Sequence, residues 1–457
     1  MIPTIESRIR NPVNLRRHVT PSVRLIAGLG VLLLIGTLLM NLPGIGVDGR
    51  LQFIEALFTA VSAITCTGLT VITPAVDLTI LGQFFLLCLI QVGGVGYMTS
   101  AILVLQLAGQ RISMLDRIAL RDAFGLLRTG AIIDFAKQVI VIVLTVEIIG
   151  VALLWLHWRN ILPEASPTLW LTIFHVVSAF CNAGFDLFTG QSAFPEGIPT
   201  DNITLAIMGS LIFLGSIGFP VIANFISYHK SKRLTLHTRL TVAITVLILV
   251  TGTASLILSE SLPGGLLINE APLRRFSLAL YQIISTRTAG FAAMGGFQAF
   301  SSASRLMIIT LMFIGASPGS MGGGMKTGTL ITLLLTTWAY TRSAQTVTIR
   351  KRTLPWGIIR RATAVLLISI LVVALATWLI LLTHPENLET VLFEVISAFA
   401  TCGYTISLTA RLSPFGLVIL MFTMFWGKLG PITIAVALTG TLRKHLVKYP
   451  EEQILIG

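Results

Sequence analysis

The sequence predicts an all-α membrane protein in which eight spanning helices and four shorter re-entrant helices form four repeats about a pseudo-fourfold axis. Three observations predict this fold class: the composition is apolar, apolar stretches recur at membrane-spanning length, and one short motif returns four times. Of 457 residues, 54% are hydrophobic and only 11% are charged, which is too little polar surface for a soluble protein of this length.

Eight apolar stretches are long enough to cross a bilayer, because about 20 helical residues traverse about 30 Å of hydrocarbon. The first is too long, and lacks the small-residue cleavage site, for a secretory signal. The predicted spans are Ser22–Leu42, Thr79–Leu107, Gln138–Trp158, Thr204–Ser227, Leu240–Leu258, Leu306–Ala339, Ala362–Leu382 and Phe415–Leu438.

The basic residues indicate the orientation in the membrane. Net charge is +13, and 22 of the 32 Lys and Arg residues lie in five segments that an even number of spans places on one side. This positive-inside pattern predicts a multi-pass protein of the plasma (inner) membrane with both termini in the cytoplasm. Basic residues scattered over short loops predict no nucleic-acid partner.

Each pair of spans encloses a shorter apolar segment, which is too short to cross but long enough for a re-entrant helix. These segments are Leu51–Thr65, Leu169–Phe180, Leu273–Ser285 and Leu388–Ala400. Each leads into a similar string that ends in glycine: Ser62–Gly68 (SAITCTG), Ser178–Gly184 (SAFCNAG), Ser285–Gly290 (STRTAG) and Ser397–Gly403 (SAFATCG).

The four glycines are 116, 106 and 113 residues apart, which indicates four copies of one helix–loop–helix unit. Small residues also let spanning helices pack closely, but close packing does not require the glycine to follow a half-length helix. Non-helical backbone at membrane depth has to line water or protein. Four such segments on one axis can present rings of carbonyl oxygens that replace the hydration shell of a cation.

The four strings resemble the filter segments of the Trk/Ktr/HKT superfamily of potassium transporters, and the chain most resembles the membrane subunit of the bacterial Ktr potassium uptake system. The resemblance covers nearly the whole chain and implies four membrane–pore–membrane repeats. Serine at the first filter glycine goes with sodium permeation in some plant members, so Gly68 implies potassium. The implied filter residues are Thr67, Gly68, Ala183, Gly184, Ala289, Gly290, Cys402 and Gly403, with K⁺ bound by the carbonyls of Cys66, Thr67, Asn182, Ala183, Thr288, Ala289, Thr401 and Cys402.

A glycine-rich segment, Gly315–Gly328, interrupts the second span of the third repeat. Six glycines and a proline in fourteen residues cannot continue a straight helix. The resemblance implies an intramembrane gating loop, whose residues are Gly315, Ser317, Gly319, Ser320, Gly322, Gly323, Gly324 and Lys326, together with Lys428 in the fourth repeat. A phosphate-binding loop is the rival interpretation, but Met325 stands where its GK[ST] pattern needs glycine.

Charged and sulfur-containing residues at membrane depth raise further possibilities. Arg287 precedes Gly290 by three residues and is expected to clamp carbonyls of the loop, although intramembrane charges are functional by default. The superfamily usually has arginine at the position of Lys428. Asp186 is expected to draw cations, and Glu55 and Glu394 to make local hydrogen bonds. A metal site at Cys66, Cys181 and Cys402 is disfavoured by their unequal offsets from the glycines.

The expected organisation follows the repeats: 1–20 cytoplasmic N-terminus, 21–109 first repeat, 110–130 linker, 131–228 second repeat, 229–238 linker, 239–341 third repeat with gating loop 315–328, 342–361 linker, 362–445 fourth repeat and 446–457 cytoplasmic C-terminus. An alternative function is secondary transport of another cation or a small solute, for which paired broken helices in two halves would be expected. The spans contain no nucleophile–base arrangement, so no enzyme activity is expected.

The resemblance also implies partners. It suggests a homodimer seated on a cytoplasmic ring of nucleotide-binding (RCK-type) regulatory subunits. ATP/ADP or NAD would bind only to that ring, and no cofactor is expected to be attached to this chain. Sodium stimulation is a further implication. The short basic loops are suited to a partner of opposite charge.

Overall fold

A computed structural model describes residues 21–96, 132–164, 166–191 and 197–430. Regular structure in these residues is almost entirely helical, apart from a hairpin of β1 (Thr348–Ile349) and β2 (Arg352–Thr353). The expected cytoplasmic termini 1–20 and 446–457 and the linker 110–130 lie outside the described residues. The ends of the predicted spans Thr79–Leu107 and Phe415–Leu438 also lie outside them.

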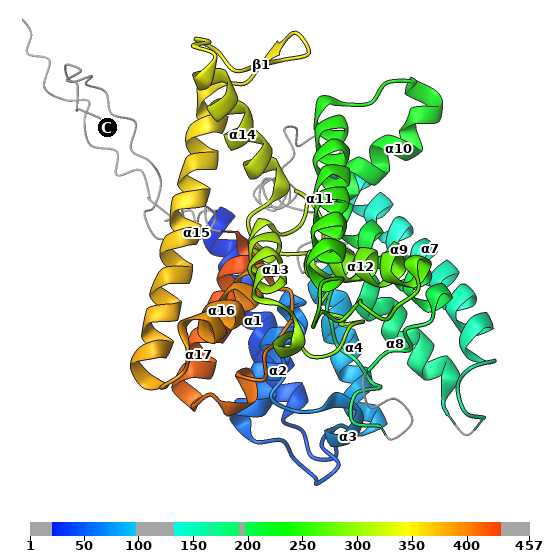
Figure 1. Cartoon of the computed structure of the whole chain (residues 1–457). Helices are drawn as coiled ribbons and strands as arrows, with labels where there is room; N and C mark the ends of the chain where they lie inside the picture. The colour runs from blue at the N-terminus through cyan, green and yellow to red at the C-terminus, as the bar shows by residue number, and fades with distance from the viewer. Residues whose placement is uncertain (1–20, 97–131, 165, 192–196, 431–457) are drawn as a thin grey trace, which may run out of the picture.

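The described helices form four successive groups, each with a long first helix, a short second helix and a third helix (Figure 1). The first group is α1 (Pro21–Met40), α2 (Phe53–Thr65) and α4 (Ile80–Val95), with the short α3 (Pro74–Asp77) between the last two. The second is α7 (Ile132–Trp158), α8 (Thr168–Phe180) and α9 (Asn202–Ile217), which α10 (Phe219–Ser231) follows directly.

The third group is α11 (Leu236–Glu260), α12 (Pro272–Thr286), α13 (Ser302–Ile314) and α14 (Thr327–Thr341), with a one-turn helix η1 (Phe297–Ala299). The fourth is α15 (Trp356–Thr383), α16 (Leu388–Ala400) and α17 (Pro414–Leu429), with η2 (Thr409–Arg411). The hairpin, α10 and α14 lie at one end of the molecule and α3 lies at the opposite end (Figure 1).

The groups pack in a closed order around the short helices. The third helix of each group contacts the short helix of the next: α4 contacts α8, α9 contacts α12, α13 contacts α16, and α17 closes the order by contacting α2. The short helices are the most buried elements, because they carry fully buried side chains such as Phe58, Phe180 and Phe399. Segments far apart in the sequence are thereby brought to one central region.

Helix length alone identifies fewer crossings than the eight that the sequence predicts. Among the described residues, three helices (α7, α11 and α15) are long and apolar enough to span a bilayer, or four if the bent pair α9–α10 is one span. The predicted continuous span Thr204–Ser227 is wrong in this respect, since α9 and α10 meet at an angle of 96°. The other apolar helices are shorter.

A glycine at positive φ explains where the third helices stop. Each of these four helices has such a glycine as its C-cap, in a left-handed conformation that other residues rarely adopt. The residues are Gly96, Gly218, Gly315 and Gly430, with φ of 88°, 96°, 62° and 84°.

A second set of glycines lies three residues before three of these C-caps and lets helices approach closely. A Cβ added to Gly93, Gly215 or Gly427 would collide with the backbone oxygen of Ile64, Phe180 or Phe399. Each of these oxygens lies in the last turn of the short helix in the same group. The third helices can therefore support the short helices backbone to backbone in three of the four groups.

Candidate functional site

The four glycines of the repeated motif share one backbone conformation. Gly68, Gly184, Gly290 and Gly403 have φ of 85°, 70°, 76° and 91°. The residue two positions before each glycine also has positive φ, although none of these residues is a glycine. They are Cys66, Asn182, Thr288 and Thr401, with φ of 52°, 53°, 96° and 51°. Alternating backbone handedness turns successive peptide carbonyls to one side, which suits a carbonyl-lined surface.

These glycines meet in a ring. A Cβ added to Gly68 would lie 2.5 Å from the backbone oxygen of Ala183, and one added to Gly184 would lie 2.6 Å from that of Ala289. The same close contact joins Gly290 to the oxygen of Cys402, and Gly403 to that of Thr67. Each glycine thus faces the carbonyl that precedes the next glycine, and the fourth returns to the first. No side chain fits in this ring.

The backbone amides and carbonyls of the ring differ in their hydrogen bonding. The amides of Thr67, Ala183, Ala289 and Cys402 each donate to the oxygen of the serine that begins the motif, at 2.8–2.9 Å. The eight carbonyls predicted to bind K⁺ accept no hydrogen bond from any described residue. Buried carbonyls normally have a partner, so their free lone pairs call for water or a cation.

A polar side chain inside each of three short helices anchors the chain that leaves the ring. His175 Nε2, Gln282 Oε1 and Glu394 Oε2 each face the amide of the residue three positions after the glycine, at 3.2 Å in all three cases. Those amides belong to Leu187, Ala293 and Ile406. In the first group the corresponding residue is Thr59, whose hydroxyl has no partner in the described part of the chain. The side chains differ in kind, so the motif search missed this recurring position.

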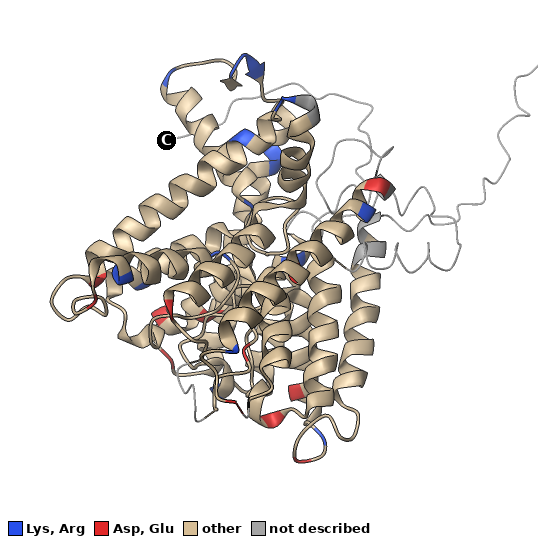
Figure 2. Ribbon diagram, turned by 90° about the vertical axis from the view of Figure 1, so that its right-hand side faces the viewer, with Lys and Arg blue, Asp and Glu red and all other residues tan. Residues whose placement is uncertain are grey.

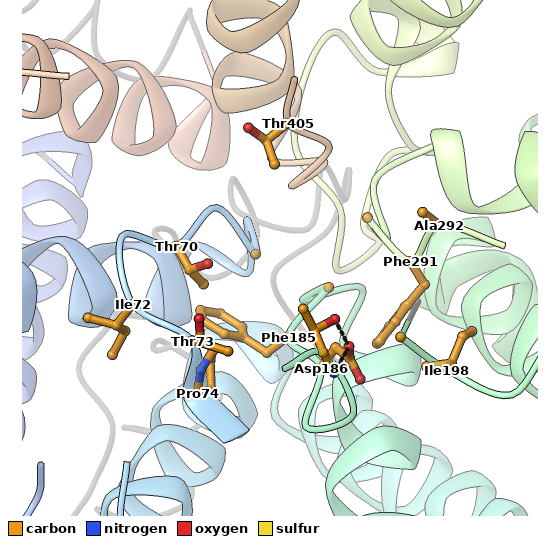
Figure 3. A pocket seen from close by; sticks show the side chains of 15 residues that line it. Thr70, Ile72, Thr73, Pro74, Phe185, Asp186, Ile198, Phe291, Ala292 and Thr405 are labelled. Atoms are coloured by element: carbon orange, nitrogen blue, oxygen red, sulfur yellow. Dashed lines mark hydrogen bonds between the residues drawn. The ribbon is translucent and has the colours of Figure 1, made fainter. Parts of the chain in front are cut away.

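A pocket of about 230 Å³ opens beyond the ring (Figure 3). It is lined by three of the ring glycines and by Thr70, Thr73, Phe185, Asp186, Phe291 and Thr405, among others. Asp186 is the acidic residue among them. Burial alone would raise the pKa of the Asp186 carboxyl, but its contact with His175 and its hydrogen bonds from Thr189 and Phe188 hold that pKa below its ordinary value. An ionised carboxylate therefore stands at this mouth.

The loop between α13 and α14 lies on the opposite side of the ring, held by the break between α9 and α10. Ser317 N and Met321 N donate to the oxygens of Ser216 and Gly215, and Phe219 N donates to the oxygen of Gly319. The last turn of α9 and the first residue of α10 thus receive the loop. The bend at Gly218 makes room for it, since a Cβ there would lie 2.6 Å from the oxygen of Pro318.

The same loop reaches the residues that precede the ring glycines. Gly323 N donates to Thr401 Oγ1 at 2.9 Å. A Cβ added to Gly322 would collide with Thr288 Oγ1. Gly322 and Gly323 thus lie directly against two of the four positive-φ residues. Gly319 and Ser320 lie instead on the side of α9 and α10, where Ser320 Oγ donates to the oxygen of Ser317.

Two lysine side chains donate hydrogen bonds to backbone oxygens of the loop between α13 and α14. Lys428 Nζ donates to the oxygen of Met321 at 2.8 Å. Lys326 Nζ donates to the oxygen of Gly322. Both ammonium groups are therefore held against consecutive peptide groups of the loop.

Arg287 does not act as the predicted clamp in the described residues. Its side chain is 1% exposed, and its Nε and Nη2 have no hydrogen-bond partner there. The predicted local roles of the two glutamates are confirmed: Glu55 accepts from Gln52 N, and Glu394 accepts from Thr405, Ile406 and Thr409.

The cysteine thiols near the glycines face different partners. Cys66 faces the oxygen of Ile90, Cys181 the amide oxygen of Gln91, and Cys402 the oxygen of Thr286. No group of three His, Cys, Asp or Glu side chains suited to a metal ion occurs in the described residues.

Comparisons with known proteins agree with this architecture. Residues 30–444 match the TrkH family, described as cation transport protein. The chain is 34% identical over 441 residues to the Ktr system potassium uptake protein B of Vibrio alginolyticus, covering 96% of this chain and 95% of that protein. It is 32% identical over 451 residues to the potassium/sodium uptake protein NtpJ of Enterococcus hirae, covering 97% and 98%. The crystal structure of the potassium transporter TrkH from Vibrio parahaemolyticus has the same fold, with a TM-score of 0.70, 19% identity and coverage of 95% and 86%.

Proposed function

The chain belongs to the TrkH family of cation transport proteins, and on that premise we propose that it takes up potassium ions through a selectivity filter formed by its four glycine segments. The observation that carries the proposal is the closed ring in which each glycine faces the carbonyl before the next. The names of relatives over 30% identical, which describe potassium or potassium/sodium uptake, support the choice of ion.

The filter would work by replacing water. The ring oxygens of Thr67, Ala183, Ala289 and Cys402 form one layer, and those of Cys66, Asn182, Thr288 and Thr401 form a second layer. Carbonyl oxygens without protein donors can take the place of the hydration shell that a potassium ion leaves behind. The short helices also point their C-terminal, partially negative ends toward the ring, which favours a cation over an anion.

The loop Gly315–Gly328 would be the gate. Its contacts with Thr401 and Thr288, two residues of the proposed filter, support this role, and its glycines leave the backbone free to adopt another path. Lys428 and Lys326 would hold it in the closed position. The remaining predicted gate residues, Gly315, Ser317, Gly319, Ser320 and Gly324, would form its hinges and its seat on α9 and α10.

The cytoplasmic face would receive a regulatory partner. Basic residues gather at the end of the molecule that carries the hairpin, which contains Arg350, Lys351 and Arg352 (Figure 2). The positive-inside pattern predicts that this end faces the cytoplasm. We propose a ring of nucleotide-binding subunits there, which binds ATP/ADP or NAD, and a homodimer of this chain above it. Sodium stimulation of uptake belongs to the same proposal.

Isotope flux tests the function. The purified full chain, reconstituted in liposomes with its cytoplasmic partner, should take up rubidium when potassium or rubidium is the only substrate supplied, and excess potassium should compete better than sodium. Uptake that requires an organic solute would contradict the proposal and favour a secondary transporter instead. Protein that is folded and correctly inserted but carries no rubidium would also contradict it.

A further inference from the structure

A buried histidine–aspartate pair at the outer mouth has hydrogen bonds that depend on a single proton. His175, in α8, is fully buried. Its Nδ1 lies 2.7 Å from the backbone oxygen of Leu171. A carbonyl oxygen only accepts, so Nδ1 carries a hydrogen and this side of the ring is fixed.

The other ring nitrogen faces two groups with opposite needs. His175 Nε2 lies 2.9 Å from Asp186 Oδ1, which accepts, and 3.2 Å from the amide of Leu187, which donates. A protonated Nε2 satisfies the carboxylate and makes the ring an imidazolium. A neutral ring accepts from Leu187 instead, and turns a lone pair toward the carboxylate. One proton therefore decides which of the two contacts is made.

The surroundings of His175 leave Asp186 as the charged group in contact with it. Trp158 of α7 and Phe188 pack on the ring, with centroids 5.4 and 4.7 Å away. On the elements packed against α8, the other titratable groups are Asp134, Lys137, Glu147 and His157 of α7, Cys88 of α4, and Asp201, which pairs with His157 at the start of α9. Tyr281 of α12 lies near Asp186. Glu394, across the pocket, is bonded to Thr405, Ile406 and Thr409 rather than to a histidine.

Building on the proposed function, we propose that His175 and Asp186 form a proton-binding site that sets how strongly the outer mouth attracts the transported cation. Asp186 lines the pocket that Gly68, Gly184 and Gly290 also line (Figure 3). When His175 is protonated, the pair is nearly neutral and attracts cations weakly. When His175 is neutral, the charge of Asp186 is uncompensated and concentrates cations at the mouth. External acid should therefore weaken the apparent affinity for potassium.

The third repeat contains a non-titrating version of the same anchor. Gln282 holds the corresponding place in α12: its Oε1 accepts from Ala293 N at 3.2 Å, and its Nε2 donates to Tyr404 Oη at 3.0 Å. The amide of Gln282 therefore accepts and donates at the same time, whereas His175 Nε2 can do only one of the two. His175→Gln is thus a substitution for which the chain itself provides the structural precedent.

The test compares initial rates of rubidium uptake against external potassium at about pH 5.5 and about pH 7.5, in cells that lack their own potassium uptake. For the wild type, the apparent KM should rise about twofold to threefold at the lower pH, as expected for one unit charge about 8 Å from the ion in water-like surroundings. His175→Gln should keep the low KM at both values. Asp186→Asn should have the high KM at both.

His157→Gln is the matched control, because it removes the other histidine of a His–Asp pair while sparing the pocket, and it should keep the pH dependence of the wild type. A wild-type KM that is independent of pH, or His175→Gln protein that retains the full dependence, would overturn the inference. If His175→Gln protein does not reach the membrane, Asp186→Asn decides, and a pH dependence of wild-type size in that variant overturns the inference as well. Absence of any rubidium uptake by the wild type would instead refute the proposed function.

Discussion

Lys428 of α17 donates a hydrogen bond to the backbone oxygen of Met321, 2.8 Å away, and so ties the fourth group of helices to the glycine-rich loop of the third group. A free ammonium group near a permeation path would repel a cation. At about 4 Å and an effective dielectric constant of about 20, that repulsion amounts to about 4 kcal/mol. Because the Lys428 ammonium group is bonded to the carbonyl of Met321, it stabilises the loop in its position against the ring.

Lys428→Ala should therefore increase potassium flux. A hydrogen bond to a charged group contributes about 1.5–3 kcal/mol, so losing one that forms only with the loop in place shifts the loop equilibrium about tenfold or more. Rubidium uptake into liposomes that contain this chain alone measures the change. Lys428→Arg keeps the charge and a donor and should remain close to the wild type. Reduced flux through folded Lys428→Ala protein would contradict the holding role.

Thr401→Val should loosen the same loop at its contact with the ring. The substitution keeps the side-chain shape but removes the hydroxyl that accepts from Gly323 N at 2.9 Å. A buried amide left without a partner costs about 1–3 kcal/mol, so the loop should leave this position more often and flux should rise. Thr401→Ser retains the acceptor and is the control. Equal flux through the two variants would show that this hydrogen bond does not hold the gate.

Gly68→Ser should weaken the discrimination of potassium from sodium. Its Cβ would lie 2.5 Å from the oxygen of Ala183, and its φ of 85° is costly for serine, so the ring has to widen or distort. Relative potassium and sodium uptake in a strain without its own potassium uptake measures the effect. Gly44→Ser is a matched control, because Gly44 has the same φ but nothing within 4 Å of its Cβ position. An unchanged ratio in Gly68→Ser at normal expression would argue against the filter assignment.

Sequence periodicity located the ring glycines because the backbone there tolerates no side chain. The same residue type, glycine, therefore recurs at this position in all four motifs. Periodicity could not locate the position three residues before each motif serine, because Thr59, His175, Gln282 and Glu394 occupy it with four different kinds of side chain. Hydropathy missed the bend at Gly218 because apolar residues continue through it on both sides. Hydropathy also could not predict that Arg287 Nε and Nη2 lack hydrogen-bond partners among the described residues.

The orientation in the membrane can be tested by labelling single cysteines. All four native cysteines would first be replaced. A cysteine at Lys351, in the hairpin, should then react only from the cytoplasm, and one at Glu164, between α7 and α8, only from outside. An impermeant maleimide applied to intact cells and to inverted vesicles distinguishes the two sides. Labelling of both positions from the same side would refute the paired-span topology.

Shortening the loop provides the strongest test of the gate. Removing Ser320–Gly323 deletes both carbonyls that receive lysines, those of Met321 and Gly322, and the amide that donates to Thr401. It also deletes the amide of Met321, which donates to the oxygen of Gly215. The remaining glycines, Gly319 and Gly324, have positive φ and can rejoin the chain without a side-chain clash. If the loop obstructs the path, flux through this chain alone should rise above the wild-type value and depend less on the cytoplasmic partner.

If the loop is merely a tolerated break in the helix, the same deletion should misfold the protein or leave flux unchanged. Size-exclusion behaviour and thermal unfolding of the purified variant separate misfolding from loss of gating. Folded shortened protein with flux at or below that of the wild type would rule out the gate. In that case Lys428→Ala and Thr401→Val should be silent too, because all three changes act on the one position of the loop.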